Sequence, residues 1–245
     1  MIFLLTNDDG ISAPGLLALE KALRSRGSAR IVTVAPAFSC SGMSRSITLY
    51  KPVRVEQVGE DRHALDGTPA DCVVWGLKHL LREKAAVVIS GINHGPNLGD
   101  DIAFSGTVAA ALEGARYGIP ALAVSLASER VYDFTHAVRF ALAGVEKLLS
   151  HPPASGVAIS MNVPSGEPSG VKVTRPGRRV YSDEIVERAD PFGRSYYWLA
   201  GSGKLSGSPD PGTDIDAVTG GFVSVTPLDS DFHAGYTDMS EWTRS

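Results

Sequence analysis

The sequence has few cysteines, no excess of basic residues and no long apolar run. Cys40 and Cys72 are too few for a disulfide framework or a thiolate metal site, and they favour a reducing compartment. Lys and Arg number 23 against 27 Asp and Glu, which argues against a binder of polymeric nucleic acid. No stretch approaches the roughly 18 apolar residues of a membrane span, and residues 1–5 do not resemble a signal peptide. We therefore expect a cytoplasmic protein without a membrane segment.

The chain has instead enough apolar sequence for one large core, since 43% of its 245 residues are hydrophobic and 20% are charged. Strand-like and helix-like segments alternate over its first part. The expected strands are 2–6, 29–35, 85–90, 121–125 and 157–163, and the expected helices are 14–26, 69–83, 107–117 and 133–149. This alternation predicts an α/β fold with a doubly wound, mostly parallel, Rossmann-like sheet.

The composition changes after residue 163, where Gly, Ser, Pro and Asp separate short β-like runs at 171–174, 196–199 and 222–226. We predict a core at 1–163 that contains a metal site. Residues 164–245 are expected to form a β-rich extension and C-terminal arm that serve oligomerisation, within a single structural unit. Within the core, 47–55 is expected to be an extended excursion.

Polar clusters follow three of the expected strands, and ligands of open α/β sheets bind outside the carboxyl ends of the strands. The first cluster is Asn7-Asp8-Asp9-Gly10. Adjacent carboxylates repel each other unless a cation lies between them, and oxygen ligands suit Mg²⁺ or Mn²⁺. A solvated turn in which Gly10 supplies a positive φ is the alternative interpretation.

The second cluster, at 39–46, follows the second expected strand. Its hydroxyl and backbone N–H groups are able to contact a metal or a phosphate, and Arg45 is able to pair with an anion. The same composition is also that of an ordinary loop.

The third cluster, at 90–101, is the most informative. Its glycines let a ligand approach the backbone, and Asn93 and Asn97 offer amide groups to a metal or an anion. Ser105 or Thr107 is expected to cap the next helix, whose free N–H groups form an anion site. An elaborate helix cap is the alternative. Thr68 is expected to cap the helix at 69–83, with Asp71 at its third position.

Taken together, these segments resemble the SurE (survival protein) family, and the resemblance covers nearly the whole chain. The segments that carry it are Leu5-Thr6-Asn7-Asp8-Asp9-Gly10-Ile11, Val34-Ala35-Pro36, Ser41-Gly42-Met43-Ser44-Arg45-Ser46-Ile47-Thr48-Leu49, Gly67-Thr68-Pro69-Ala70-Asp71-Cys72, Ser90-Gly91-Ile92-Asn93-His94-Gly95-Pro96-Asn97-Leu98-Gly99, Ser105-Gly106-Thr107-Val108, Ala111-Leu112-Glu113-Gly114, Asp190-Pro191-Phe192-Gly193-Arg194, Tyr196-Tyr197-Trp198, Gly212-Thr213-Asp214 and Ser224-Val225-Thr226-Pro227-Leu228.

The resemblance implies a metal-dependent 5′-nucleotidase that releases phosphate from nucleoside 5′-monophosphates. It assigns one divalent cation per subunit, Mg²⁺ or Mn²⁺, to Asp8, Asp9, Ser41 and Asn93, and it implies a homodimer or homotetramer. The register of the second cluster selects Ser41 rather than Ser39. One departure is 37–40, where the family commonly has a charged stretch; no expected ligand is lost there.

The expected reaction is attack by a water molecule on the phosphoryl group. Asp8 or Asp9 orients or deprotonates that water, and His94 assists the leaving group. The residues leave open whether 3′-nucleotides and short polyphosphate are also substrates. The expected substrate and phosphate contacts are Asn7, Arg45, Gly95, Asn97, Ser105, Gly106 and Thr107.

Two competing interpretations share some of these features. A phosphatase of the haloacid dehalogenase type needs Asp-x-Asp after the first strand, which Asn7-Asp8-Asp9 does not supply. A non-catalytic receiver-like sensor of phosphate or nucleotides also carries an acidic pair there. It requires a phosphate-accepting Asp after the third sheet strand, where this chain has Ser90-Gly91-Ile92-Asn93.

Overall fold

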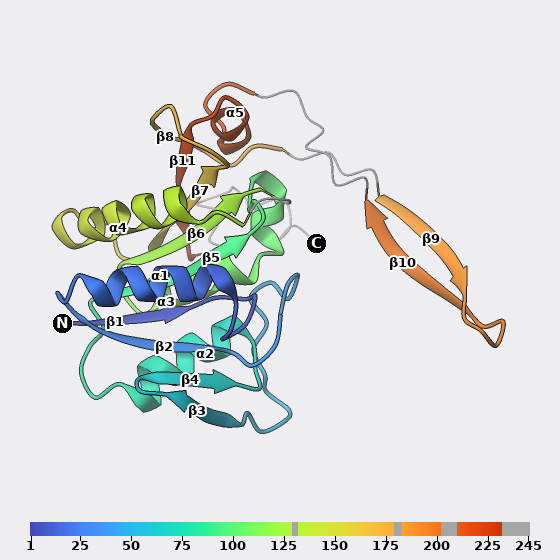
Figure 1. Ribbon diagram of the computed structural model, residues 1–245, viewed down its shortest axis with the longest axis horizontal. Helices are drawn as coiled ribbons and strands as arrows, with labels where there is room; N and C mark the ends of the chain where they lie inside the picture. Colours follow the sequence, from blue (N-terminus) through green and yellow to red (C-terminus); the bar gives the residue numbers. More distant parts are fainter. Residues whose placement is uncertain (129–131, 179–182, 202–209, 232–245) are drawn as a thin grey trace, which may run out of the picture.

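A nine-stranded sheet forms the centre of the computed structural model, which describes residues 1–128, 132–178, 183–201 and 210–231 (Figure 1). Its strand order is β3-β4-β2-β1-β5-β6-β7-β11-β8. The strands are β1 (Ile2–Thr6), β2 (Arg30–Pro36), β3 (Val55–Gly59), β4 (Arg62–Leu65), β5 (Val87–His94), β6 (Ala121–Ala127), β7 (Val157–Pro164), β8 (Val171–Val173) and β11 (Val223–Asp229).

The middle of this sheet is parallel from β4 through β2, β1, β5 and β6 to β7. β3 is antiparallel to β4, and β11 is antiparallel to β7. The chain starts in the middle of the sheet and winds outward in both directions, so the predicted doubly wound, mostly parallel fold is confirmed. This order places the carboxyl ends of β1 and β5 side by side.

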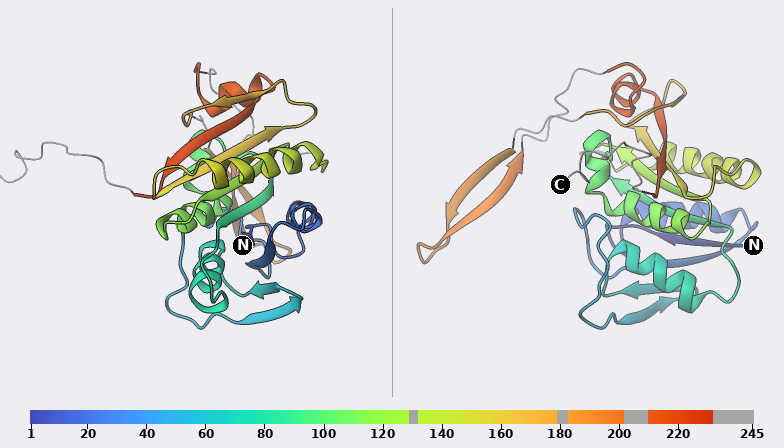
Figure 2. Two further views of the ribbon diagram at one scale, coloured as in Figure 1. Left: turned by 90° about the vertical axis from the view of Figure 1, so that its left-hand side faces the viewer. Right: turned by 180° about the vertical axis from the view of Figure 1, so that it is seen from behind.

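Helices cover both faces of the sheet (Figure 2). They are α1 (Pro14–Ser25), α2 (Pro69–Trp75), α3 (Gly106–Arg116), α4 (Thr135–Ser150) and α5 (Asp214–Thr219), with the π-helical turn η1 (Gly76–Leu80) and the 3-10 helix η2 (Gly99–Ala103). Side chains of β1 alternate between two apolar clusters, because neighbouring strand residues point to opposite faces. Phe3 and Leu5 pack with residues of α1 and α4, and Leu4 packs with residues of α2 and α3.

The largest departures from the predicted elements are three. The helix expected at 69–83 is α-helical only to Trp75 and continues as η1. The strand expected at 85–90 continues to His94, with irregular pairing between Ser90 and Asn93, so part of the third cluster lies within β5. The excursion expected at 47–55 contains no strand before Val55, where the unpredicted hairpin β3–β4 begins.

The segment after residue 164 divides into two parts. β8, α5 and β11 complete the main sheet and its covering layer, so the sheet does not end where the composition changes. Only β9 (Asp183–Ala189) and β10 (Ser195–Gly201) form a separate antiparallel hairpin, which projects away from the sheet (Figure 1). Residues 232–245, where a C-terminal arm was predicted, lie outside the described residues. Within the described ranges, no helix has the length and apolar character needed to span a membrane.

Candidate metal centre and active site

A polar cavity of about 300 Å³ lies at the carboxyl ends of β1 and β5. Four segments far apart in the sequence form it: the turn after β1, the loop after β2, the end of β5 with the following loop, and the start of α3. The lining residues are Asp8, Asp9, Ser41, Gly42, Asn93, His94, Gly95, Pro96, Asn97, Asp101, Phe104 and Ser105. All four predicted metal ligands are therefore brought to one cavity.

A hollow of about 500 Å³ at the opposite, amino end of β1 offers no comparable chemistry. It is lined mainly by apolar side chains such as Leu23 and Leu149. Its charged residues, Arg26 and Glu146, form an ion pair with each other. The polar cavity is therefore the candidate active site.

Asp8 is almost fully buried and is held by the first turn of α3. The backbone N–H of Thr107 donates to its Oδ2 at 3.0 Å, and the Thr107 hydroxyl donates to its Oδ1. Burial raises the pKa of Asp8 to about 6, the nearby charge of Asp9 adds to the rise, and the Thr107 bonds oppose it. A bound cation would supply the positive charge that this buried carboxylate lacks.

Gly106 explains how α3 comes so close to Asp8. A Cβ at this position would lie 2.8 Å from the Cβ of Asp8 and 3.0 Å from its Oδ2. The missing side chain therefore allows the start of the helix to contact the carboxylate.

Asp9 is held by a different element. The backbone N–H of His94, the last residue of β5, donates to its Oδ2 at 3.2 Å. Burial raises the pKa of Asp9, and the bond from His94 opposes the rise. The two adjacent carboxylates thus have separate anchors at the ends of α3 and β5.

Asn93 and Ser41 add neutral oxygens to the cavity. Asn93 Nδ2 donates to the carbonyl of Gly95 at 2.9 Å, and no donor among the described residues reaches its Oδ1. The Ser41 hydroxyl lies 3.1 Å from that of Ser39. A backbone bond of 2.7 Å from Cys40 N to the Asp8 carbonyl holds this loop beside the first turn.

This donor set fits a hard divalent cation, because carboxylate, amide and hydroxyl oxygens are the ligands that Mg²⁺ and Mn²⁺ prefer. In the part of the chain that the structure describes, no three His, Cys, Asp or Glu side chains gather as a metal site. A cation here would therefore depend on the neutral oxygens of Ser41 and Asn93 as well as on the two carboxylates.

Comparison with known proteins identifies the family of this chain. The family described as "Survival protein SurE" matches residues 3–183. The chain belongs to the SurE family. It is 45% identical to "5'-nucleotidase SurE" of Anaeromyxobacter sp. (strain Fw109-5), over 99% of this chain and 96% of that protein. It is 44% identical to the protein of the same name from Myxococcus xanthus (strain DK1622), over 98% and 92%.

A solved relative shows the same fold. The SurE protein of Aquifex aeolicus superposes with a TM-score of 0.84 and 39% identity, over 96% of this chain and 95% of that chain. The resemblance to SurE is thereby confirmed, and SurE 5'-nucleotidases are generally metal-dependent.

His94 contributes a half-buried ring to the lining of this SurE cavity. Its ring stacks on Tyr132 with centroids 3.8 Å apart, and Phe134 packs edge-on at 6.4 Å. Its Nε2 is buried and has no hydrogen-bond partner among the described residues. The two aromatic contacts hold the ring beside the carboxylates.

The predicted phosphate contacts fall into two groups. Gly95, Asn97 and Ser105 line the cavity. Ser105 is the N-cap of α3, because its Oγ accepts the Val108 N–H at 3.1 Å, so of the two predicted caps Ser105 is the observed one. Asn97 Nδ2 donates to the hydroxyl of Ser125 at 2.7 Å.

Three other predicted contacts lie behind the cavity wall rather than on it. Asn7 closes the first turn, with its Nδ2 donating to the Gly10 carbonyl at 3.0 Å. Gly106 and Thr107 support Asp8, as described above. These residues position the carboxylate, which the sequence alone did not indicate.

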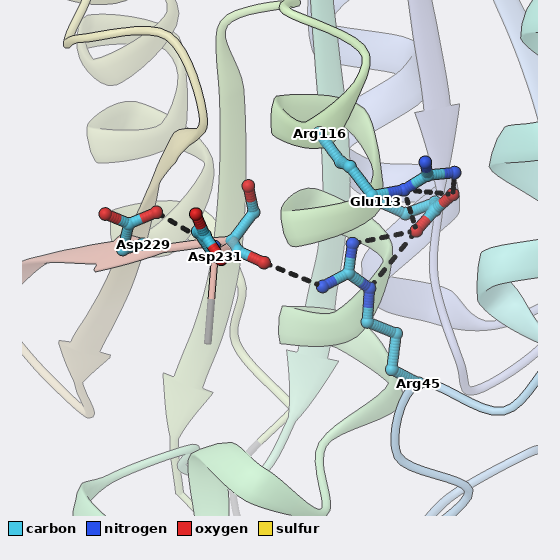
Figure 3. A network of polar contacts seen from close by, with 6 residues as sticks. Arg45, Glu113, Arg116, Asp229 and Asp231 are labelled. Atoms are coloured by element: carbon cyan, nitrogen blue, oxygen red, sulfur yellow. Dashed lines mark hydrogen bonds and ion pairs between the residues drawn. The ribbon is translucent and has the colours of Figure 1, made fainter. Parts of the chain in front are cut away.

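Arg45 is directed away from the cavity, contrary to the prediction that it binds the phosphate. Its Nε and Nη2 donate to Oε2 of Glu113 at 3.1 and 3.0 Å, and its Nη1 donates to the Ser230 carbonyl at 3.2 Å (Figure 3). Glu113 is buried and also pairs with Arg116, and these cations hold its pKa low against the effect of burial. The guanidinium of Arg45 is thus paired with the buried carboxylate of Glu113.

Asp101 and Phe104 line the cavity, and sequence reasoning gave neither a role. Asp101 is buried, and its pKa is raised to about 6 by burial and by the charges of Asp100 and Asp214. Asp101 belongs to the third polar cluster, at 90–101, where only the asparagines and glycines were expected to contact a ligand. Phe104 directly precedes Ser105 in the sequence, and from this neighbour its place at the cavity could have been predicted.

Proposed function

We infer that this chain is a divalent-cation-dependent phosphomonoesterase that hydrolyses nucleoside 5′-monophosphates to nucleoside and phosphate. The observation that carries the inference is the convergence of Asp8, Asp9, Ser41 and Asn93 on one cavity beside the capped start of α3. The names of its relatives support the substrate class.

Mg²⁺ or Mn²⁺ is the proposed ion, with Asp8, Asp9, Ser41 and Asn93 as its ligands. When bound, such an ion acts as a Lewis acid toward a phosphoryl oxygen and lowers the pKa of bound water. The ion would also restore the ordinary acidity of the two carboxylates, which burial opposes.

The chain's own residues supply the rest of the reaction. Asp8 or Asp9 accepts a proton from the attacking water as its oxygen bonds to phosphorus. The Ser105 hydroxyl, the Asn97 amide and the backbone near Gly95 bind the phosphoryl oxygens. As the bond from phosphorus to O5′ breaks, His94, which lines the cavity, donates a proton to that oxygen, and the nucleoside leaves as an alcohol.

A phosphate-release assay with AMP tests the activity. We expect steady turnover that EDTA abolishes and that added Mn²⁺ or Mg²⁺ restores. A protein that binds AMP and metal without releasing phosphate would instead be the receiver-like sensor. Ribose 5-phosphate, 3′-AMP and short polyphosphate in the same assay define the range of substrates.

We also propose that the protein is a cytoplasmic homo-oligomer, a dimer or tetramer, in which the β9–β10 hairpin contacts another subunit. Isolated two-stranded hairpins are marginally stable in water, and this one exposes Tyr197 and Trp198. The free thiols of Cys40 and Cys72 fit a reducing compartment. Light scattering of the purified protein measures the assembly state.

A further inference from the structure

Phe104 separates the polar cavity from a second, larger hollow. It lines the 300 Å³ cavity and also a groove of about 790 Å³ on the other side of η2. The groove walls include apolar side chains from distant segments, namely Ile102, Leu112, Pro176 and Leu228. The two hollows therefore share one aromatic wall. The lining on one side is polar, and on the other side apolar side chains stand beside Ser44, Arg45, Asp100 and Asp229.

The polar cavity alone does not provide for a whole nucleotide. Its volume is at the lower end of the range for small-molecule sites, and carboxylates, amides and backbone groups dominate its lining. Such a lining suits a phosphoryl group and a cation, whereas a nucleobase needs apolar surface to cover its faces. The groove beyond Phe104 is the adjoining apolar space.

The backbone of Phe104 is fixed on both sides of the residue. Its N–H donates to the Asp101 carbonyl at 2.9 Å, and its carbonyl accepts from Ser44 N at 3.0 Å. The next residue is Ser105, the N-cap of α3 at the proposed phosphate site. A phosphoryl group held at Ser105 thus brings the rest of its ester close to the Phe104 ring.

The ring itself is 61% exposed, although its neighbour Ser105 is buried. Phe134 is buried, and Tyr132, although 64% exposed, has one face covered by the ring of His94. Phe104 is the only aromatic residue besides His94 in the described lining of the polar cavity. Its open face is available to another flat ring.

We propose that Phe104 is a stacking platform for the base of the nucleotide substrate and that the groove behind it takes up that base. The proposal rests on the proposed function and names a specificity-determining residue for it. Stacking uses the π face that every base has, so all common bases are accepted and purines bind more tightly than pyrimidines because they cover more of the ring.

The test compares two substrates that carry the same phosphate ester, AMP and ribose 5-phosphate, and only AMP has a base. In the full-length protein, Phe104→Ala and Phe104→Leu are expected to lower kcat/KM for AMP about tenfold, mainly through KM, because base stacking on an aromatic ring contributes roughly a factor of ten in affinity. The value for ribose 5-phosphate stays within about twofold. Phe104→Trp is expected to retain or improve the AMP value.

Tyr50→Ala is the matched control, since Tyr50 is fully exposed and is not among the residues that line the described cavities. Tyr50→Ala is expected to leave kcat/KM unchanged for both AMP and ribose 5-phosphate. If ribose 5-phosphate is hydrolysed too slowly for its kcat/KM to be measured, its inhibition constant is measured with AMP as the substrate, and that constant is compared between the variants. Far-UV circular dichroism and Tm confirm that each variant folds, and Leu keeps the apolar bulk of Phe if Ala does not fold.

Two results would overturn the proposal: an equal loss for both substrates, which indicates a structural role, or unchanged AMP kinetics in Phe104→Ala and Phe104→Leu. The proposed function fails by a different result, namely no phosphate release from AMP by the parent protein with Mn²⁺ or Mg²⁺.

Discussion

The sheet edge that carries the active site and the β9–β10 hairpin are opposites in the way they are stabilised. β1 has no residue more than 7% exposed, and the carboxylates of Asp8 and Asp9 in the turn after it are held by bonds from other elements. Among the described residues, the hairpin pairs only with itself (Figure 2). Its Trp198 is 62% exposed. The comparison teaches that the site needs little beyond the α/β unit, whereas the hairpin needs an additional surface to pack against.

The largest expected effect comes from Asp8→Asn. The substitution removes one negative charge from the proposed ion site and leaves a side chain of the same size, so we expect kcat/KM for AMP to fall at least about 100-fold. Tm stays close to the parent value or rises, because a buried carboxylate with a raised pKa is replaced by a neutral amide. The Kd for Mn²⁺, measured by calorimetry, rises.

Glu187→Gln is the control on the hairpin, where the carboxylate is exposed and accepts a hydrogen bond from the Tyr197 hydroxyl at 3.3 Å. Glu187→Gln is expected to leave the rate of AMP hydrolysis unchanged. Near-parental phosphate release by Asp8→Asn in saturating Mn²⁺ would show that Asp8 is not a ligand.

Gly106→Ala tests the close approach of α3 to Asp8. The added methyl group would lie 2.8 Å from the Asp8 Cβ, so the carboxylate or the helix has to move. We expect kcat/KM to fall about 10- to 100-fold, because small displacements in a catalytic site are costly. We also expect Tm to fall by roughly 3–10 °C from overpacking.

Gly59→Ala in β3 is the matched control, since its new methyl group meets Arg62 only at ordinary contact distance, 3.5 Å. Its rate and Tm are expected to stay near those of the parent. Parental kinetics for Gly106→Ala would contradict the positioning of Asp8 by α3.

Replacing Tyr196, Tyr197 and Trp198 by serine tests the other region. The apolar contact surface of the hairpin is lost, so light scattering is expected to show dissociation into smaller species. AMP hydrolysis per chain stays within about threefold, because the described cavity contains no hairpin residue. If the oligomer stays intact in this variant, the hairpin does not form the proposed interface.

The smallest expected effect is a pH-dependent change in stability for Asp101→Asn. The folded-state pKa of Asp101 is raised from 3.8 to about 6, so ionising it costs stability as the pH rises through that interval. In EDTA, the Tm of Asp101→Asn is therefore expected to exceed that of the parent by a few degrees at pH 7.5 and by less at pH 4.

Asp190→Asn provides the contrast on the hairpin. The pKa of Asp190 is lowered, mainly by the Arg194 N–H, so the sign is opposite, and its place on the separate hairpin leaves the global Tm nearly unchanged. A Tm difference for Asp101→Asn that does not depend on pH would exclude the ionisation cost.

Local patterns predicted much of the fold and part of the site. Apolar runs predicted β1 and β5, and the turn Asn7-Asp8-Asp9 after β1 predicted the acidic pair. The Thr68–Asp71 capping box was also predicted, since both partners lie within one helical turn. In each case, the interacting residues are close together in the sequence.

The failures involve partners that are distant in the sequence. Thr107 holds Asp8 from 99 positions away, and Glu113 binds Arg45 from 68 positions away. A serine, threonine or arginine in a loop offers the same atoms to a ligand or to the protein, and only the packing of α3 decides between them. The extension of β5 beyond Ser90 was missed for the same reason, because pairing with the distant β6 resumes at Asn93 after an irregular step.

Arg45 connects three segments that are far apart in the sequence. One guanidinium links the loop that begins at Ser41 to the buried Glu113 of α3 and to the carbonyl of Ser230, just after the last strand of the sheet. The loop that contains Ser41 is therefore braced against α3 and against the chain just after β11 by contacts within the protein.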